Sequence, residues 1–223
     1  IMLKGKTVLI GITAGIAAYK ICTLIRLYKK AGADVKVVIT PNASKFITKL
    51  TLQSLSNNEV YSDSFEIDEY KPEHISLTCA DIFVIAPATA NSISKIANGI
   101  SDNLLLSVAC AFKNPVLIAP AMNTNMWENT FVQDNINKLK LNGYNILEPA
   151  EGFLACGTNG KGRMVEPEEI FEKTTEILTL KQTLLGKKFL ITAGGTKEKI
   201  EKHTRFLMVN AFLETKVHFY LRM

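Results

Sequence analysis

The segment Lys6-Thr7-Val8-Leu9-Ile10-Gly11-Ile12-Thr13-Ala14-Gly15 sets the architecture of the chain. Residues 6–12 are rich in apolar and β-branched side chains, which predicts a buried strand, and the small residues after them predict a tight turn. A helix is expected over residues 16–30, with Ile16, Tyr19, Leu24, Leu27 and Tyr28 on or near one face. It should stop at Gly32, and residues 34–40 should form a second strand.

The same alternation continues along the chain. Further strands are expected at residues 81–86, 115–118 and 144–147, and helices at 43–50, 104–112, 130–141 and 167–180. Ser101 or Asp102 is expected to cap the helix at 104–112. Residues 51–70 read as a short helix and a loop. Five or more strands with helices between them predict a doubly wound α/β fold, Rossmann-like, with a mostly parallel sheet and helices on both faces.

Composition excludes several classes of protein. The net charge of +5 comes from residues 181–223, which hold nine Lys or Arg against three Asp or Glu, so no basic stripe points to nucleic acid. No apolar run is long enough to cross a membrane, and the start lacks the layout of a signal peptide, so a cytoplasmic location is expected. Cys22, Cys79 and Cys110 lie among apolar residues and are expected to be inert core thiols. No C-x-x-C pair suggests a metal.

The turn at Gly11–Gly15 carries the first chemical signal. Small residues let backbone N–H groups approach an anion, and the following helix adds its partial positive charge. The spacing is neither G-x-G-x-x-G nor a Walker motif, which favours a mononucleotide phosphate over a dinucleotide. Thr40, at the end of the second strand, is expected to face the same crevice. The alternative is that the glycines serve helix–sheet packing alone.

Two further strand ends carry polar side chains. Pro87–Ser92 combines small residues with hydroxyl and amide groups, which suits a flat aromatic ligand. Ala119–Trp127 holds two amides, two thioethers and the one tryptophan of the chain. In an open α/β sheet, ligands bind beyond the carboxyl ends of the strands. The alternative for the second stretch is an Asn-rich turn whose Met and Trp side chains pack back onto the core.

A histidine and a glycine-rich segment complete the candidates. His74 is expected to open a short helix; a lone histidine is more often a surface residue than a catalyst. Cys156 lies within the Gly-rich residues 149–165, together with Lys161 and Arg163, which could meet an anion. This composition is typical of a mobile flap that closes on substrate or, alternatively, of an unstructured surface loop.

Four motifs together resemble the homo-oligomeric flavin-containing cysteine decarboxylases, most closely their phosphopantothenoylcysteine decarboxylase members. The most specific motif is Pro120-Ala121-Met122-Asn123-x-x-Met126-Trp127, followed by Ala155-Cys156-Gly157-x-x-Gly160-x-Gly162-Arg163-Met164. Gly15–Lys20 and Pro87–Asn91 support both. The resemblance covers about residues 3–182, which it marks as one FMN-binding decarboxylase domain.

The resemblance implies the cofactor, the reaction and the roles of residues. FMN would be held by Gly11, Thr13, Ala14, Gly15, Thr40, Phe46, Ala88, Thr89, Ala90, Asn91 and Met122. The reaction would convert 4′-phospho-N-pantothenoylcysteine to 4′-phosphopantetheine and carbon dioxide by oxidation of the cysteinyl group, decarboxylation and reduction. His74 would act at oxidative decarboxylation, Asn123 would bind the substrate carboxylate, and Cys156 would donate a proton during reduction. Substrate contacts would also come from Met126, Gly157, Arg163 and Met164.

The family also implies a homo-oligomer, a trimer or a dodecamer of trimers, with the site between subunits. Two other functions remain open: a related flavoprotein (a flavin prenyltransferase or a peptidyl-cysteine decarboxylase), and a flavin-binding regulatory subunit. Residues 189–198 resemble the opening of a phosphopantothenate–cysteine ligase domain, but the Asp-Pro-x-Arg and Ser-Ser-Gly-Lys stretches of that domain are missing. Residues 183–223 are therefore expected to be a truncated ligase-like start or a non-autonomous tail without ligase activity.

Overall fold

The computed structural model describes residues 2–62, 76–153, 157 and 159–179, all within the first of two units, Ile1–Lys181, into which the chain divides. Over these ranges the main sheet has six parallel strands in the order β3-β2-β1-β4-β5-β6. Their bounds are β1 (Thr7–Ile12), β2 (Asp34–Ile39), β3 (Val60–Tyr61), β4 (Ile82–Ala88), β5 (Val116–Pro120) and β6 (Asn145–Ile146). The predicted doubly wound α/β fold is confirmed.

Strand order creates a switch point between β1 and β4. From β1 the chain continues outward through β2 and β3, and then returns to the centre to build β4, β5 and β6 on the other side. Leu9 of β1 therefore lies between Lys36 of β2 and Phe83 of β4. Connections leave the sheet in opposite directions at this point, and in open α/β sheets a ligand crevice is expected there, beyond the carboxyl ends of β1 and β4.

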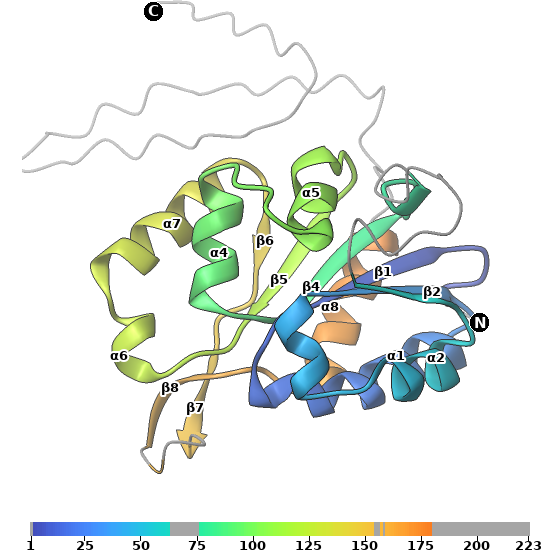
Figure 1. Cartoon of the computed structure of the whole chain (residues 1–223), viewed down its shortest axis with the longest axis horizontal. Helices are drawn as coiled ribbons and strands as arrows, with labels where there is room; N and C mark the ends of the chain where they lie inside the picture. The colour runs from blue at the N-terminus through green and yellow to red at the C-terminus, as the bar shows by residue number, and fades with distance from the viewer. Residues whose placement is uncertain (1, 63–75, 154–156, 158, 180–223) are drawn as a thin grey trace, which may run out of the picture. The chain divides into compact units, whose positions relative to one another are not determined.

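Helices cover both faces of the sheet (Figure 1). One face packs against η1 (Ile16–Lys20), α1 (Ile21–Lys30), η2 (Pro41–Lys45), α2 (Lys49–Ser56) and α8 (Pro167–Thr179). The other packs against α4 (Ala90–Ala97), α5 (Leu104–Ala111) and α7 (Thr130–Leu141). The pleat of β1 explains this division, because Val8, Ile10 and Ile12 enter the first core while Leu9 enters the second.

The glycine-rich segment is a hairpin rather than a structureless loop over the part that the structure describes. Strand β7 (Ala150–Phe153) pairs antiparallel with β8 (Asn159–Arg163), with Gly152 opposite Gly160. Gly152 and Gly162 have φ angles of 157° and 150°, which a side chain would strain. The glycines thus permit a particular backbone path, and the expectation of an unstructured surface loop is wrong for these residues.

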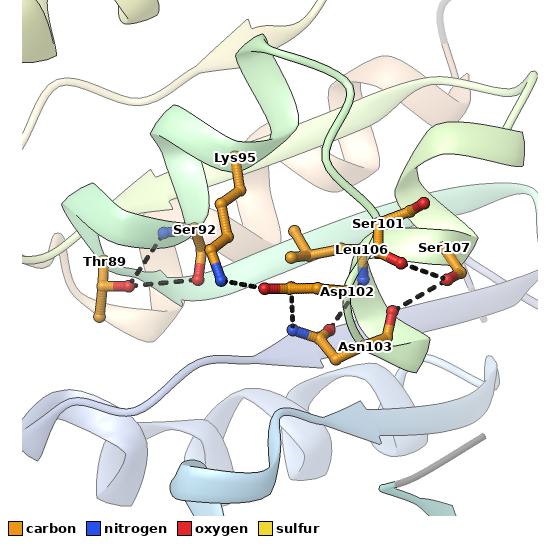
Figure 2. Close-up of polar contacts among 8 residues, drawn as sticks. All are labelled: Thr89, Ser92, Lys95, Ser101, Asp102, Asn103, Leu106 and Ser107. Carbon is orange, nitrogen blue, oxygen red and sulfur yellow. Dashed lines mark hydrogen bonds and ion pairs between the residues drawn. The ribbon is translucent and has the colours of Figure 1, made fainter. Parts of the chain in front are cut away.

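Several predicted helix boundaries are also wrong. The helix expected at 43–50 is the short η2 followed by α2, which begins after Thr48, whose hydroxyl accepts a hydrogen bond from the Thr51 N–H at 3.2 Å. Helix α4 was not predicted, although Ala90, Ile93 and Ala97 lie at helical spacing and are buried, because the small and polar residues around them are also typical of a loop. Strand β3 was missed for its shortness. Asn103, rather than Ser101 or Asp102, caps α5 by accepting from the Leu106 N–H at 3.1 Å (Figure 2).

The solvent exposure of two η1 side chains and of three cysteines differs from what the sequence predicts. Ile16 and Tyr19 are 61% and 62% exposed, since they lie on η1, whose tighter winding turns them away from the face that buries Leu24 and Tyr28. Cys79 and Cys110 are exposed and Cys22 is half-buried, so none is a fully buried core thiol. Helix α1 does end before Gly32, whose φ of 90° only glycine adopts easily. Among the described helices, none is long and apolar enough to span a bilayer.

Candidate functional site

A buried hydroxyl joins the two strand ends at the switch point. Thr13, 1% exposed, follows β1, and its Oγ1 donates to the Pro87 carbonyl at 2.7 Å while accepting from the Thr89 N–H at 3.0 Å. The Thr13 N–H donates to the same Pro87 carbonyl at 3.2 Å. One side chain therefore fixes the separation of the β1 and β4 loops, which form the two walls of the crevice.

Backbone hydrogen bonds extend this edge across neighbouring strand ends. The Thr40 N–H, after β2, donates to Ile12 at 3.0 Å, and the Ala121 N–H, after β5, donates to Ala88 at 2.9 Å. The Met122 N–H then donates to Gly162 of β8 at 3.0 Å. The predicted strand-end loops therefore do converge, along one continuous row at the carboxyl edge of the sheet.

The turn before η1 is suited to an anion. Gly15 occupies the N-cap position without a side-chain cap, and the first turn of the helix carries no acidic residue. The first N–H groups of a helix have no intrahelical partner and favour negative charge. A Cβ built on Gly15 would lie 3.8 Å from Pro87 Cγ and 3.9 Å from Thr89 Cγ2, so an added methyl group would only touch the β4 loop and the turn lies directly against that loop.

A polar network holds α4 and α5 at the other wall, as Figure 2 shows. Thr89 caps α4 by accepting from the Ser92 N–H at 3.3 Å, and Lys95 pairs with Asp102 of the following loop. Asp102 also accepts from Asn103 at 3.3 Å. The network orients the start of α4, where Ala90 and Asn91 supply the first N–H groups, toward the carboxyl edge of the sheet.

The Asn-rich stretch forms a short helix, α6 (Thr124–Trp127). Asn123 precedes it, and its Oδ1 accepts from the Asn125 N–H at 2.9 Å. Trp127 is 5% exposed and packs into the core, whereas Met126 is 48% exposed. The alternative that this stretch packs back onto the core is therefore confirmed for Trp127. Asn125 and Met126 lie at the surface.

A carboxylate links the hairpin to the first helix. Glu166 Oε1 lies 2.8 Å from Lys20 Nζ of η1 and 2.9 Å from Arg163 Nη2 of β8. The hydrogen bond from Lys20 lowers the pKa of Glu166, and the charges of Lys20 and Arg163 act in the same direction. The predicted anion-binding Arg163 is thus paired within the chain, at a place where a bound anion would compete with Glu166.

A second carboxylate supports the other side of the hairpin. Glu148 accepts from Lys140 and Lys161, both at 2.9 Å, and the Lys140 hydrogen bond is the largest cause of its lowered pKa. The Lys161 Nζ also lies 5.7 Å from the centre of the Trp127 ring. These contacts attach β8 to α7 and α6.

Some predicted site residues have packing roles in the structure. A Cβ on Gly11 would lie 2.8 Å from the Phe83 ring, so this glycine is needed for core packing whatever it does for a ligand. Ala88 and Met164 are 0% and 1% exposed and belong to the core, while Phe46 is 48% exposed after η2. Their contacts with cofactor or substrate stay predictions. Gly157 and Asn91 are exposed, and His74 and Cys156 lie outside the described residues.

Sequence reasoning missed the residues that hold the site together. Lys20 and Glu166 are 146 positions apart, and no local pattern relates them. Thr124, Gly160 and Gly162 belong to the quoted motifs, yet their mutual contacts depend on how β8 lies against α6. Within residues 2–62, 76–153, 157 and 159–179, no three His, Cys, Asp or Glu side chains cluster as metal ligands would.

Comparisons with known proteins agree with this geometry. A family model described as Flavoprotein matches residues 2–179. The coenzyme A biosynthesis bifunctional protein CoaBC of Bacillus subtilis is 46% identical over 207 residues, 90% of this chain and 50% of that protein. The chain therefore spans about half the length of the curated relatives it matches.

Two solved structures match this chain over almost their whole length. A mutant of PPC decarboxylase, complexed with pantothenoylaminoethenethiol, superposes with a TM-score of 0.68 at 33% identity, over 76% of this chain and 96% of that chain. The FMN binding protein AtHal3 gives a TM-score of 0.66 at 34% identity, over 77% and 95%.

Proposed function

This chain belongs to the Flavoprotein family, and on that premise we propose that it is an FMN-dependent decarboxylase of 4′-phospho-N-pantothenoylcysteine, yielding 4′-phosphopantetheine and carbon dioxide in coenzyme A biosynthesis. The observation that carries the proposal is the convergence of four motif-bearing segments on the crevice at the β1–β4 switch point. The CoaBC and PPC decarboxylase matches supply the substrate class. A cytoplasmic location is part of the same proposal.

The residues at this edge of the sheet suit a flavin mononucleotide. Its phosphate would meet the uncapped start of η1 at Ala14 and Gly15, where no acidic side chain opposes an anion. Its ring would lie toward the β4 and β5 loops, bordered by Thr89–Asn91 and Met122. Thr13 would act indirectly, because both hydrogen-bonding directions of its hydroxyl are used to join the loops. Thr40 and Phe46 would border the site from the β2 side.

The chain's own residues have separable tasks in this reaction. When bound, FMN would supply the electron sink for decarboxylation and return the electrons afterwards. Asn123 would hold the substrate carboxylate through its amide, and Arg163, with Glu166 as its resting partner, would meet the substrate phosphate. We assign the proton donor for product reduction to Cys156 and a role at the oxidative step to His74. Met126, Gly157 and Met164 complete the proposed substrate contacts.

The site is proposed to lie between copies of the chain. Ile16, Tyr19 and Phe46 are 61%, 62% and 48% exposed. All three lie on η1 or directly after η2, at the carboxyl edge of the sheet. Large apolar side chains exposed beside a site are typical of an interface. A trimer, or a dodecamer of trimers, would cover them, and light scattering on the purified protein measures the oligomeric mass.

The decisive experiment combines spectroscopy with product analysis. The purified, FMN-loaded protein is mixed anaerobically with phosphopantothenoylcysteine while the visible spectrum and carbon dioxide are followed. The serine analogue of the substrate is the control, since it lacks the oxidisable thiol. Flavin bands that change, with carbon dioxide released from the cysteine substrate alone, are expected. A protein that binds FMN and releases nothing would be a flavin-binding regulatory subunit, and one that acts only on a C-terminal peptidyl cysteine would serve another pathway.

The role of Cys156 is tested in the same assay. Cys156→Ser should still release carbon dioxide, but it should stall at an oxidised product because the proton donor for reduction is lost. Mass spectrometry distinguishes this product from 4′-phosphopantetheine by two mass units of hydrogen. Normal phosphopantetheine from the variant would remove Cys156 from the mechanism.

A further inference from the structure

Strand β8 lies unusually close to the segment that carries Asn123. A Cβ built on Gly160 would lie 2.3 Å from Thr124 Oγ1 and 3.1 Å from its Cγ2. A Cβ built on Gly162 would lie 2.3 Å from the Met122 carbonyl oxygen. Between these two glycines, Lys161 reaches out to Glu148 and the Trp127 ring. Gly160 and Gly162 therefore lie directly against the Met122–Trp127 segment, and Lys161 lies over the ring of Trp127 in the same segment.

The close approach of β8 to the Met122–Trp127 segment leaves one buried polar group without a partner and gives another a hydrogen bond. Thr124 Oγ1 is buried and has no hydrogen-bond partner, which is unfavourable for a hydroxyl. The Met122 N–H, in contrast, is satisfied by the Gly162 carbonyl at 3.0 Å. The chain thus accepts an unpaired hydroxyl at one glycine while making a backbone hydrogen bond at the other. The hydrogen bond of Met122 and the close approach of Gly160 to Thr124 hold β8 against the chain on both sides of Asn123, which stands between Met122 and Thr124.

We propose that Gly160, Gly162 and Thr124 are positioning residues that dock β8 on the Met122–Trp127 segment and thereby set the geometry of the Asn123 amide toward the substrate carboxylate. The inference rests on the proposed function, since it assigns to Asn123 the substrate contact proposed above. Asn123 also caps α6, so a shift of Thr124 changes the cap and the amide together. None of the three residues needs to touch the cofactor or the substrate.

The test is a double-mutant cycle on the full-length, FMN-loaded chain. Gly160 has no left-handed φ, so Gly160→Ala adds a methyl group without backbone strain, and its whole effect comes from the contact with Thr124. Gly160→Ala should raise KM for phosphopantothenoylcysteine and lower kcat/KM by about tenfold, because the amide is misplaced. Against a Thr124→Ala background, where Oγ1 and Cγ2 are gone and only the Cβ at 3.2 Å remains, the same change should cost less than about threefold.

Gly162→Ala extends the series, with Gly143→Ala as the control. Gly143 has a φ of 85° but nothing within 4 Å of an added Cβ, so its substitution reports backbone strain alone. Gly162→Ala should reduce kcat/KM more than Gly160→Ala, because the obstacle is a backbone carbonyl that cannot rotate away. Gly143→Ala should lower thermal stability but leave KM unchanged.

Hydrogen exchange supplies a readout that needs no turnover. Peptides covering residues 119–127 should exchange faster in Gly160→Ala than in wild type, and Thr124→Ala should restore the slow exchange, while FMN content stays constant. Should Gly160→Ala fail to fold, restored folding in the double variant supports docking. Equal losses in both backgrounds, or no change in either readout, would overturn the inference. A wild-type protein without carbon dioxide release refutes the proposed function instead, and exchange alone then decides the docking.

Discussion

The switch-point edge and the β7–β8 hairpin meet at one site but are built from different interactions. At the edge, Thr13 is buried and joins two loops through one buried and one partly buried hydrogen bond. At the hairpin, Glu148 and Glu166 make ion pairs through carboxylates that are about half exposed, and two glycines set the close approach. Buried hydrogen bonds lose much when a partner is removed, whereas exposed ion pairs contribute little.

The difference separates two tasks. The edge is part of the core, so its integrity and that of the whole fold are coupled, and it is suited to hold a cofactor in a permanent position. The hairpin contributes few buried apolar side chains and is held by contacts that depend on pH and salt. Substitutions in the first region should therefore change stability and flavin affinity, while those in the second should change substrate use with small effects on stability.

The largest effect is expected for Thr13→Val. The change keeps the side-chain shape but leaves the Thr89 N–H without its partner, which should cost about 3 kcal/mol of unfolding free energy. FMN affinity should fall as the two walls separate. Denaturant unfolding and flavin titration measure both quantities, and Thr13→Ser, which keeps the hydroxyl, is the control. If Thr13→Val were as stable as Thr13→Ser, the Thr13 hydroxyl would not be what holds this edge together.

Gly11, which lies in strand β1 rather than in the predicted turn, and Gly15, which lies in the turn after β1, should behave differently. Gly11→Ala places a methyl group 2.8 Å from Phe83 and should destabilise the flavin-free chain by about 2 kcal/mol through overpacking. Gly15→Ala meets only ordinary contacts, so the flavin-free stability should stay the same while FMN binds more weakly. Thermal unfolding with and without FMN separates the two. Equal behaviour of both variants would contradict a division between packing at Gly11 and phosphate binding at Gly15.

Acid should weaken the hairpin region more than the edge. Pairing with Lys20 lowers the pKa of Glu166, and pairing with Lys140 and Lys161 lowers that of Glu148. Both carboxylates therefore stabilise the fold fully above the ordinary glutamate pKa of about 4.3, and this stabilisation is lost as the pH falls through that value and then through the lower folded-state pKa. Glu166→Gln should flatten the dependence of unfolding free energy on pH in this acid range. An unchanged slope would remove Glu166 from the acid response.

The smallest effect is expected for Lys161→Met. The substitution removes an exposed ion pair with Glu148 and the cation over Trp127, which together should change stability by less than about 1 kcal/mol. The emission maximum of Trp127, the single tryptophan, should shift because a charge near its ring is lost. A larger loss of stability than that of Gly160→Ala would mean that charge, rather than close backbone approach, docks the hairpin.

The sequence determined five of the six strands of the main sheet, the α/β class and the family. Residues 6–12 and 81–86 are apolar enough to be buried strands in any context, and small residues after them limit the turns that can follow. The hairpin escaped prediction because its glycines and polar residues carry no clear periodicity, and in helix α4 small and polar residues obscured the helical spacing of Ala90, Ile93 and Ala97. Their structure depends on caps such as Thr89 and on a partner strand.

Only the tertiary structure decided which residues share a wall of the site. The bridge of Thr13 to Pro87 and Thr89, the pairing of Lys20 with Glu166, and the contact of Thr124 with Gly160 all join positions distant in sequence. Such contacts depend on strand order, because parallel strands bring their carboxyl ends together whatever their separation along the chain. Local sequence sets what each strand end contains, and the order of the strands in the sheet sets what it faces.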